Sequence, residues 1–191
     1  MATDLDAVRS GDWMQTFEGR QFWPMDPRAD EIDIVDIAHS LSMQCRFAGH
    51  CRRFYSVAEH CVLLSRVVTL ENALWGLLHD ASEAYLVDVP RPVKPFLAGY
   101  KMAEQRVMDA VCERFGLGFE MPDEVRIADG RILADERDQN MSAAPVAWAD
   151  TGAPLGVTLQ FWSPSEARAA FLTAFVDLTA LAKARAAEGR S

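Results

Sequence analysis

The segment from Glu71 to Leu86 constrains the fold most, because it is apolar almost all round and yet carries ionisable side chains. A helix without a polar face has to be buried, so this segment is predicted to run as one helix through the middle of the domain. Within it stand His79, Asp80 and Glu83. Burial of an ionisable group is unfavourable unless the group is paired, hydrogen-bonded or bound to a metal. The segment therefore predicts a polar site inside a helical core.

Two other predicted helices also place ionisable groups on apolar stripes. Ser56 and Glu59 have the spacing of a capping box, and His60 stands on the buried stripe of the helix that they begin. A later helix begins near Pro122 and places Asp129 on the face that it shares with Val125, Ala128 and Ile132. Each of these groups has a plain structural reading, as a hydrogen-bonded core histidine or a solvated aspartate.

Taken together, the buried groups form a metal-ligand set. Two imidazoles and two carboxylates, from His60, His79, Asp80 and Asp129, give a mixed nitrogen and oxygen environment. Such a set suits a divalent cation such as Mn, Co, Zn or Fe better than Mg or Ca, with positions left for water or substrate. The sequence therefore predicts a metal centre at which three helices meet.

The rest of the chain predicts a single all-α domain, residues 1–191, in the form of a helical bundle. Residues 1–55 are irregular, with a small strand pair and a helical turn at Ile37–Met43, and they precede a metal-binding helical core at 56–141. That core includes a helix at Lys101–Phe115, which glycines end. Residues 143–162 are predicted as loop with one strand at 156–161. The C-terminal helix, 163–187, begins with the capping pair Ser163 and Glu166 around Pro164.

Composition narrows the range of partners. Lys and Arg number 19 against 28 acidic residues, a net charge of -9, which disfavours duplex nucleic acid because phosphate binding needs a basic face. A bound cation can still supply the charge that attracts a small phosphorylated substrate. The N-terminus lacks an apolar leader, no run of about 18 apolar residues occurs, and the four cysteines show no CxxC pair. A cytoplasmic protein without a membrane segment or a disulfide framework is expected.

Three stretches, VAEHC (57–61), LLHDASEAYLVDVPRPVK (77–94) and IADGRILADE (127–136), give the chain a resemblance to a known family. Over about 80 residues it resembles the HD-domain metal-dependent phosphohydrolases, nearest to the subgroup of the bacterial 5'-deoxynucleotidase and the phage deoxynucleoside triphosphate triphosphohydrolases. The resemblance implies that the first metal histidine is His60, the HD pair His79 and Asp80, and the distal aspartate Asp129. Asp135 competes for the last position, but Asp129 stands on the apolar stripe and fits the family register.

The same resemblance implies catalytic roles for two acids. Glu83 follows His79 by four residues and Asp80 by three, so on a helix it projects toward the cluster, and the matching family glutamate orients or deprotonates the attacking water. The alternative role for Glu83 is to accept a hydrogen bond from a ligand histidine and so to fix the orientation of its ring. Asp88 matches a family acid that protonates the leaving group or holds the sugar, and otherwise it is a turn residue.

Substrate phosphate needs fixed cations, and the leading candidates are Arg46, before the His60 helix, and Lys94, after the segment of His79 and Asp80. Arg46 with Phe47 resembles the family's arginine-aromatic substrate pair. Arg52, Arg53, His39 and His50 are further candidates with ordinary surface or capping alternatives. Trp13 and Trp23 are candidates for stacking on a base, but a place in the core is the favoured prediction for both.

The predicted activity is metal-dependent hydrolysis of a phosphate ester or anhydride of a nucleotide, either a deoxynucleoside 5'-monophosphate or a deoxynucleoside triphosphate. A catalytically silent nucleotide-binding regulator is the alternative, and a structural metal domain is a third. The subgroup that the chain resembles forms oligomers, so self-association is an expectation, although no heptad repeat supports it.

Overall fold

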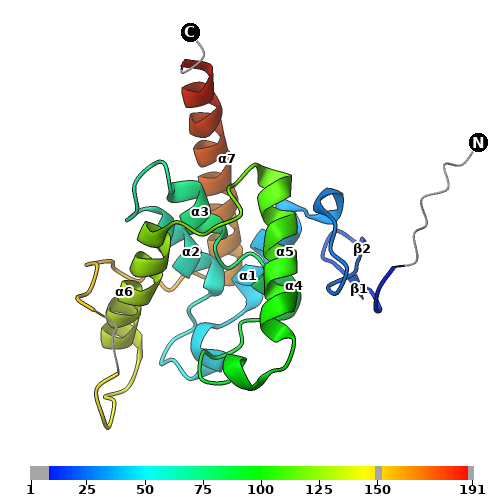
Figure 1. Ribbon diagram of the computed structural model, residues 1–191. Coiled ribbons are helices and arrows are strands. Elements are labelled where there is room, and N and C mark those ends of the chain that lie inside the picture. Colours follow the sequence, from blue (N-terminus) through cyan, green and yellow to red (C-terminus); the bar gives the residue numbers. More distant parts are fainter. Residues whose placement is uncertain (1–8, 149–151, 189–191) are drawn as a thin grey trace, which may run out of the picture.

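The computed structural model describes residues 9–148 and 152–188, and its described part is mainly helical (Figure 1). The predicted all-α class is confirmed. The elements in chain order are β1 (Met14–Gln15), β2 (Gln21–Phe22), η1 (Ala29–Glu31), α1 (Ile34–Met43), η2 (Arg46–Gly49), α2 (Val57–Ser65), α3 (Ala73–Leu78), α4 (Glu83–Leu86), η3 (Lys94–Phe96), α5 (Tyr100–Phe115), α6 (Asp123–Asn140) and α7 (Pro164–Glu188). The two strands pair antiparallel, Met14 opposite Phe22, so the predicted N-terminal strand pair is present.

Helix α2 is the centre of the fold. Every residue from Val57 to Ser65 is buried, and the helix packs against α1, α3, α6 and α7. Its start follows the prediction, because the Ser56 hydroxyl accepts a hydrogen bond from the Glu59 backbone N–H at 3.1 Å. His60, near the beginning of this helix, is thereby placed in the core.

The second half of the predicted capping box at Ser56 is wrong. The Glu59 carboxylate is buried and turns away from Ser56 to accept backbone N–H groups of residues 160, 161 and 162, at 2.7, 2.9 and 2.8 Å. Three donors satisfy a buried carboxylate better than one, so Glu59 holds the chain that leads into α7. The strand predicted at 156–161 is also wrong: this segment has no regular secondary structure and pairs with no strand among the described residues.

The predicted single helix at Glu71–Leu86 is divided in the structure. Helix α3 ends at Leu78, a tight turn covers residues 79–82, and α4 follows. Within the turn the backbone bonds join residues three apart, as from the Ala81 N–H to the Leu78 carbonyl at 2.9 Å. The apolar pattern identified the burial correctly but could not show this tightening, because α and 3₁₀ turns differ by a fraction of a residue.

The remaining helices lie close to their predicted positions. Helix α1 begins at Ile34, earlier than expected, because the Asp33 side chain caps the Val35 N–H at 2.8 Å. The capping pair of Ser163 and Glu166 is confirmed, with the Ser163 N–H donating to the Glu166 carboxylate at 2.8 Å. Helix α7 contacts α1, α2 and α3 with its first half, and its C-terminal end extends beyond the body of the protein (Figure 1). In the parts of the chain that the structure describes, no helix combines the length and apolar character needed to cross a bilayer.

Candidate metal centre

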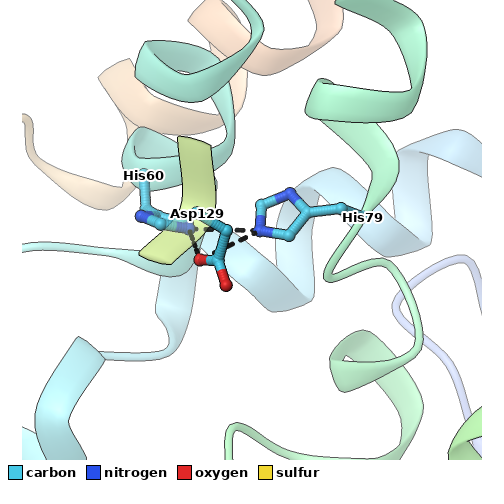
Figure 2. Close-up of side chains that lie close together, drawn as sticks. All are labelled: His60, His79 and Asp129. Atoms are coloured by element: carbon cyan, nitrogen blue, oxygen red, sulfur yellow. Dashed lines mark hydrogen bonds and ion pairs between the residues drawn. The ribbon is translucent and has the colours of Figure 1, made fainter. Parts of the chain in front are cut away.

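The four predicted ligands converge at one point, although they come from distant parts of the sequence. His60 lies on α2, His79 and Asp80 lie in the turn after α3, and Asp129 lies on α6. The two imidazole Nε2 atoms are 3.2 Å apart, and Asp129 Oδ1 is 3.3 Å from His60 Nε2 and 3.7 Å from His79 Nε2. Figure 2 shows these three side chains pointing toward one another. Asp80 Oδ2 completes the group, 3.2 Å from His79 Nε2.

Both histidines use their other ring nitrogen as a hydrogen-bond donor. His79 Nδ1 lies 2.9 Å from the Gly76 carbonyl, which can only accept, and His60 Nδ1 lies 2.7 Å from the Glu136 carboxylate. In a neutral imidazole, one nitrogen donates and the other carries a lone pair. With both rings neutral, the two Nε2 lone pairs face each other with carboxylate oxygens beside them, an arrangement that a bound cation makes favourable.

The distances suit a metal ion. Ligand atoms about 2.0–2.2 Å from one cation lie about 3.0–3.6 Å from each other in tetrahedral or octahedral geometry. The separations in this cluster run from 3.2 to 3.7 Å. His60, His79 and Asp129 are thus arranged as a set of groups that could hold a metal ion, with Asp80 adjacent. Because Asp129 is half-buried, the set opens on one side toward solvent.

The electrostatics of the cluster also favour positive charge at this place. Burial lowers the pKa of the His79 imidazole, but Asp80, Cys61 and Asp129 together outweigh burial and raise the pKa well above its ordinary value. Burial raises the pKa of Asp80, but His79 opposes it more strongly and the pKa falls to about 2. The Cys61 thiol also lies near His79, but burial raises its pKa to about 11, so it is a poor ligand beside the carboxylates.

Glu136 is hydrogen-bonded to His60 on the side of the ring that faces away from the cluster, and no role was predicted for it from the sequence. Its side chain is fully buried, holds the His60 ring through Nδ1 and accepts from the Arg46 guanidinium at 3.1 Å. A carboxylate on the far nitrogen of a ligand histidine fixes the tautomer and the ring orientation. The available sequence signal was its spacing: Glu136 follows Asp129 by seven residues, which is two helical turns, so both face α2 from α6.

The competing aspartate, Asp135, has a different role. It is buried, but its two carboxylate oxygens accept the backbone N–H groups of Leu155 and Gly156 at 2.7 and 2.8 Å. It therefore holds the connection between α6 and α7 and lies outside the metal cluster. Asp129 is the aspartate that the fold brings to His60 and His79.

A pocket of about 580 Å³ opens directly onto the cluster. Asp80 and Asp129 are part of its wall, and so are all five residues that the sequence assigned to catalysis or substrate: Arg46, Phe47, Glu83, Asp88 and Lys94. They come from η2, α4, the turn after it and η3, segments that no local pattern brings together. The volume lies in the range of small-molecule sites, about 300–1,000 Å³.

Glu83 lies in the pocket wall with one oxygen engaged and one free. Oε1 is 3.2 Å from Lys94 Nζ, whereas Oε2 is buried and has no hydrogen-bond partner. Burial, Asp80 and Asp88 raise the pKa of this carboxyl to about 9, against the lowering effect of Lys94. Burial also raises the pKa of Asp88. An unpartnered buried oxygen beside a cation site is suited to hold a water molecule.

The predicted cations of the pocket are already paired. Arg46 is only 8% exposed and lies between Glu136 and Asp80, 3.6 Å from the latter. Lys94 Nζ bridges Glu83 and Glu104, at 3.2 and 2.8 Å. Of the other lining residues, His50 was a candidate, whereas Arg91 and Trp148 were missed because they lie in loops without periodicity. Arg91 is exposed and 3.8 Å from Asp129, and Trp148 packs beside the Phe47 ring at 5.9 Å.

Several of the weaker candidates lie away from the pocket, in agreement with the structural alternatives that the sequence left open for them. None of Arg52, Arg53, His39, Trp13 or Trp23 lines the pocket. The Arg53 guanidinium covers the Phe161 ring at 3.8 Å, and His39 stacks on Phe17 at 3.7 Å. Trp23 lies under the Arg9 guanidinium. Stacking and cation-π contacts therefore explain Arg53, His39 and Trp23 without a substrate.

Comparison with known proteins identifies two bacterial relatives. The uncharacterized protein YfdR of Escherichia coli is 46% identical over 125 residues, which cover 65% of this chain and 70% of YfdR. An uncharacterized protein of Rhodobacter capsulatus is 32% identical over 179 residues, which cover 83% of this chain and 91% of that protein. No family model matches the chain. By the extent of these two matches, the chain belongs to the protein family of YfdR and its Rhodobacter capsulatus relative.

Proposed function

We propose that this protein is a metal-dependent phosphohydrolase that removes phosphate from a nucleotide. The observation that carries the proposal is the convergence of two imidazole lone pairs and two carboxylates at the wall of a pocket that also holds Glu83, with its free buried oxygen. The resemblance of the three sequence stretches to the HD-domain phosphohydrolases supports the same activity. A mixed nitrogen and oxygen set favours Mn, Co, Zn or Fe over Mg.

The charge of the pocket favours a substrate with a single phosphate. Its wall contains three cationic side chains, Arg46, Arg91 and Lys94, and four acids, Asp80, Glu83, Asp88 and Asp129. Two of the cations are bound to further carboxylates, Glu136 and Glu104. A divalent metal adds two positive charges, and a phosphate dianion leaves less negative charge unbalanced in this pocket than a triphosphate does. A deoxynucleoside 5'-monophosphate is the preferred substrate, and a triphosphate is the second choice.

Each residue has a defined part in this reaction. His60, His79, Asp80 and Asp129 hold the metal, which when bound supplies Lewis-acid stabilisation of the phosphoryl group and lowers the pKa of water. Glu83 accepts a hydrogen bond from the attacking water through its free oxygen. Asp88, with its raised pKa, donates a proton to the leaving oxygen. Phe47 and Trp148 provide an aromatic wall for the base.

A nucleotide panel tests the activity. Purified protein is incubated with each deoxynucleoside 5'-monophosphate and triphosphate, and with Mn, Co, Zn or Mg, while released phosphate and polyphosphate are measured. We expect phosphate release from monophosphates with Mn or Co, and loss of this activity in Asp129→Asn. An inactive protein across all nucleotides and metals, with metal bound, contradicts the proposal.

A silent nucleotide-binding regulator is the second candidate, because Arg46 and Lys94 are neutralised by protein carboxylates and could serve binding alone. Glu83→Gln separates the two functions: an enzyme loses turnover and keeps its metal, whereas a regulator binds nucleotide equally in both forms. A structural metal domain differs from both, since chelation would unfold it and no nucleotide would bind.

A further inference from the structure

The turn between α4 and Asp88 has a strained backbone. Val87 has φ 71° and ψ 148°, a region that is essentially restricted to glycine, and its β-branched side chain is 60% exposed. An exposed side chain gains little from burial that could offset this strain. The contacts of the backbone on either side of Val87 must therefore hold the turn.

Side chains from two other helices supply these contacts. The Gln44 amide, just after α1, donates from Nε2 to the Glu83 carbonyl at 2.9 Å, and its Oε1 accepts the Asp88 N–H at 2.9 Å. From α5, the Tyr100 hydroxyl donates to the Val87 carbonyl at 2.7 Å. One Gln44 side chain thus joins the backbone groups of the two acids in the pocket wall, Glu83 and Asp88.

Gln44 is also connected to the metal-binding helix. Its backbone carbonyl accepts the N–H of Val57, the first residue of α2, at 3.1 Å. His60 follows on the first turn of that helix. The backbone of Gln44 therefore holds the start of the His60 helix, while its side chain holds the segment from Glu83 to Asp88.

We propose that Gln44 is a positioning residue, which fixes Glu83 and Asp88 relative to each other and to the metal cluster. The proposal rests on the function proposed above, because positioning matters only if the two acids take part in a reaction. A misplacement of about 1 Å in a reacting group lowers the rate by up to about 100-fold. The strained turn is thus held in the conformation that places both acids in the pocket.

The test uses two variants of Gln44 and a matched control. Gln44→Met keeps the length of the side chain but removes its hydrogen bonds, and Gln44→Glu keeps an acceptor for the Asp88 N–H without a donor for the Glu83 carbonyl. Gln139→Met is the control, since Gln139 makes the same kind of bridge, to the Val157 carbonyl at 2.8 Å and the Leu159 N–H at 3.0 Å. Gln139 does not line the pocket.

Activity and amide hydrogen exchange are measured on the full chain loaded with Mn. For Gln44→Met we expect kcat to fall about 10- to 100-fold with KM and metal content unchanged, and exchange at the Asp88 amide to accelerate about fivefold or more. Gln44→Glu should keep the protection of the Asp88 amide and still lose rate. Gln139→Met should keep the wild-type kcat.

Two outcomes overturn the proposal. One is a kcat for Gln44→Met within about twofold of the wild type or of Gln139→Met. The other is unchanged exchange at the Asp88 amide. A wild-type protein without activity would refute the proposed function instead, and rapid exchange in Gln44→Met would then show that Gln44 holds the turn without serving hydrolysis.

Discussion

Replacement of Glu136 by Gln tests the buried support of the metal cluster. Glu136→Gln keeps the size of the side chain and removes its negative charge. In the wild type, this fully buried carboxylate lies 2.7 Å from His60 Nδ1 and 3.1 Å from the Arg46 guanidinium. Asp80, at 3.6 Å, is then the nearest carboxylate left to Arg46.

The expected loss has two separable parts. Removal of one partner from a buried ion pair destabilises a protein by about 3–5 kcal/mol, because the other charge stays buried without compensation. That is a large share of a total stability of about 5–15 kcal/mol. Loss of the carboxylate behind a ligand histidine should in addition weaken metal binding about 10- to 100-fold. The loss of folding stability can be measured in the metal-free protein, whereas the loss of metal affinity appears only when metal binding is measured.

Urea denaturation of the metal-free protein measures the first part, and titration calorimetry with Mn measures the second. Glu124→Gln is the control: Glu124 lies on the same helix and is partly buried, but it accepts from Thr69 and Asn72, which are not cluster residues. It should keep the wild-type metal affinity. A Glu136→Gln protein with wild-type stability and wild-type metal affinity would refute the reasoning.

Three further predictions concern pH, packing and metal. Because the pKa of Glu83 rises from 4.5 to about 9 on folding, the free energy of unfolding should fall as pH rises between these values, by up to about 1.4 kcal/mol per pH unit. In Glu83→Gln, urea denaturation should show a weaker dependence of the unfolding free energy on pH. Gly76→Ala should destabilise the protein by about 1–3 kcal/mol, because its new Cβ would lie 3.2 Å from the Ser65 Cα. Gly130→Ala should instead gain up to about 1 kcal/mol of helix propensity, because no neighbouring atom lies within 4 Å of its new Cβ. Thermal unfolding compares the two variants. Mn at about 100 times its dissociation constant should stabilise the wild type by about 2.7 kcal/mol and His60→Ala much less, as measured by thermal unfolding with and without chelator.

Local sequence patterns located most of the helices and identified the two buried histidines. The apolar stripe around His60, the unbroken apolar run at His79 and Asp80, and the stripe that includes Asp129 each predicted a buried ionisable side chain, and His60 and His79 are buried. The capping signals at Ser56 and Ser163 located the starts of α2 and α7, because a cap depends only on residues within one turn.

The tertiary structure decided which of these groups meet. The apolar stripe favoured Asp129 over Asp135 on the same helix, but only packing placed Asp129 against His60 and turned Asp135 toward residues 155 and 156. The redirection of Glu59 to the α7 approach and the support of His60 by Glu136 depend on contacts between residues 76 to 103 positions apart. Such contacts carry no periodic signal, because they arise where helices pack together and each buried polar group takes the nearest partner that satisfies it.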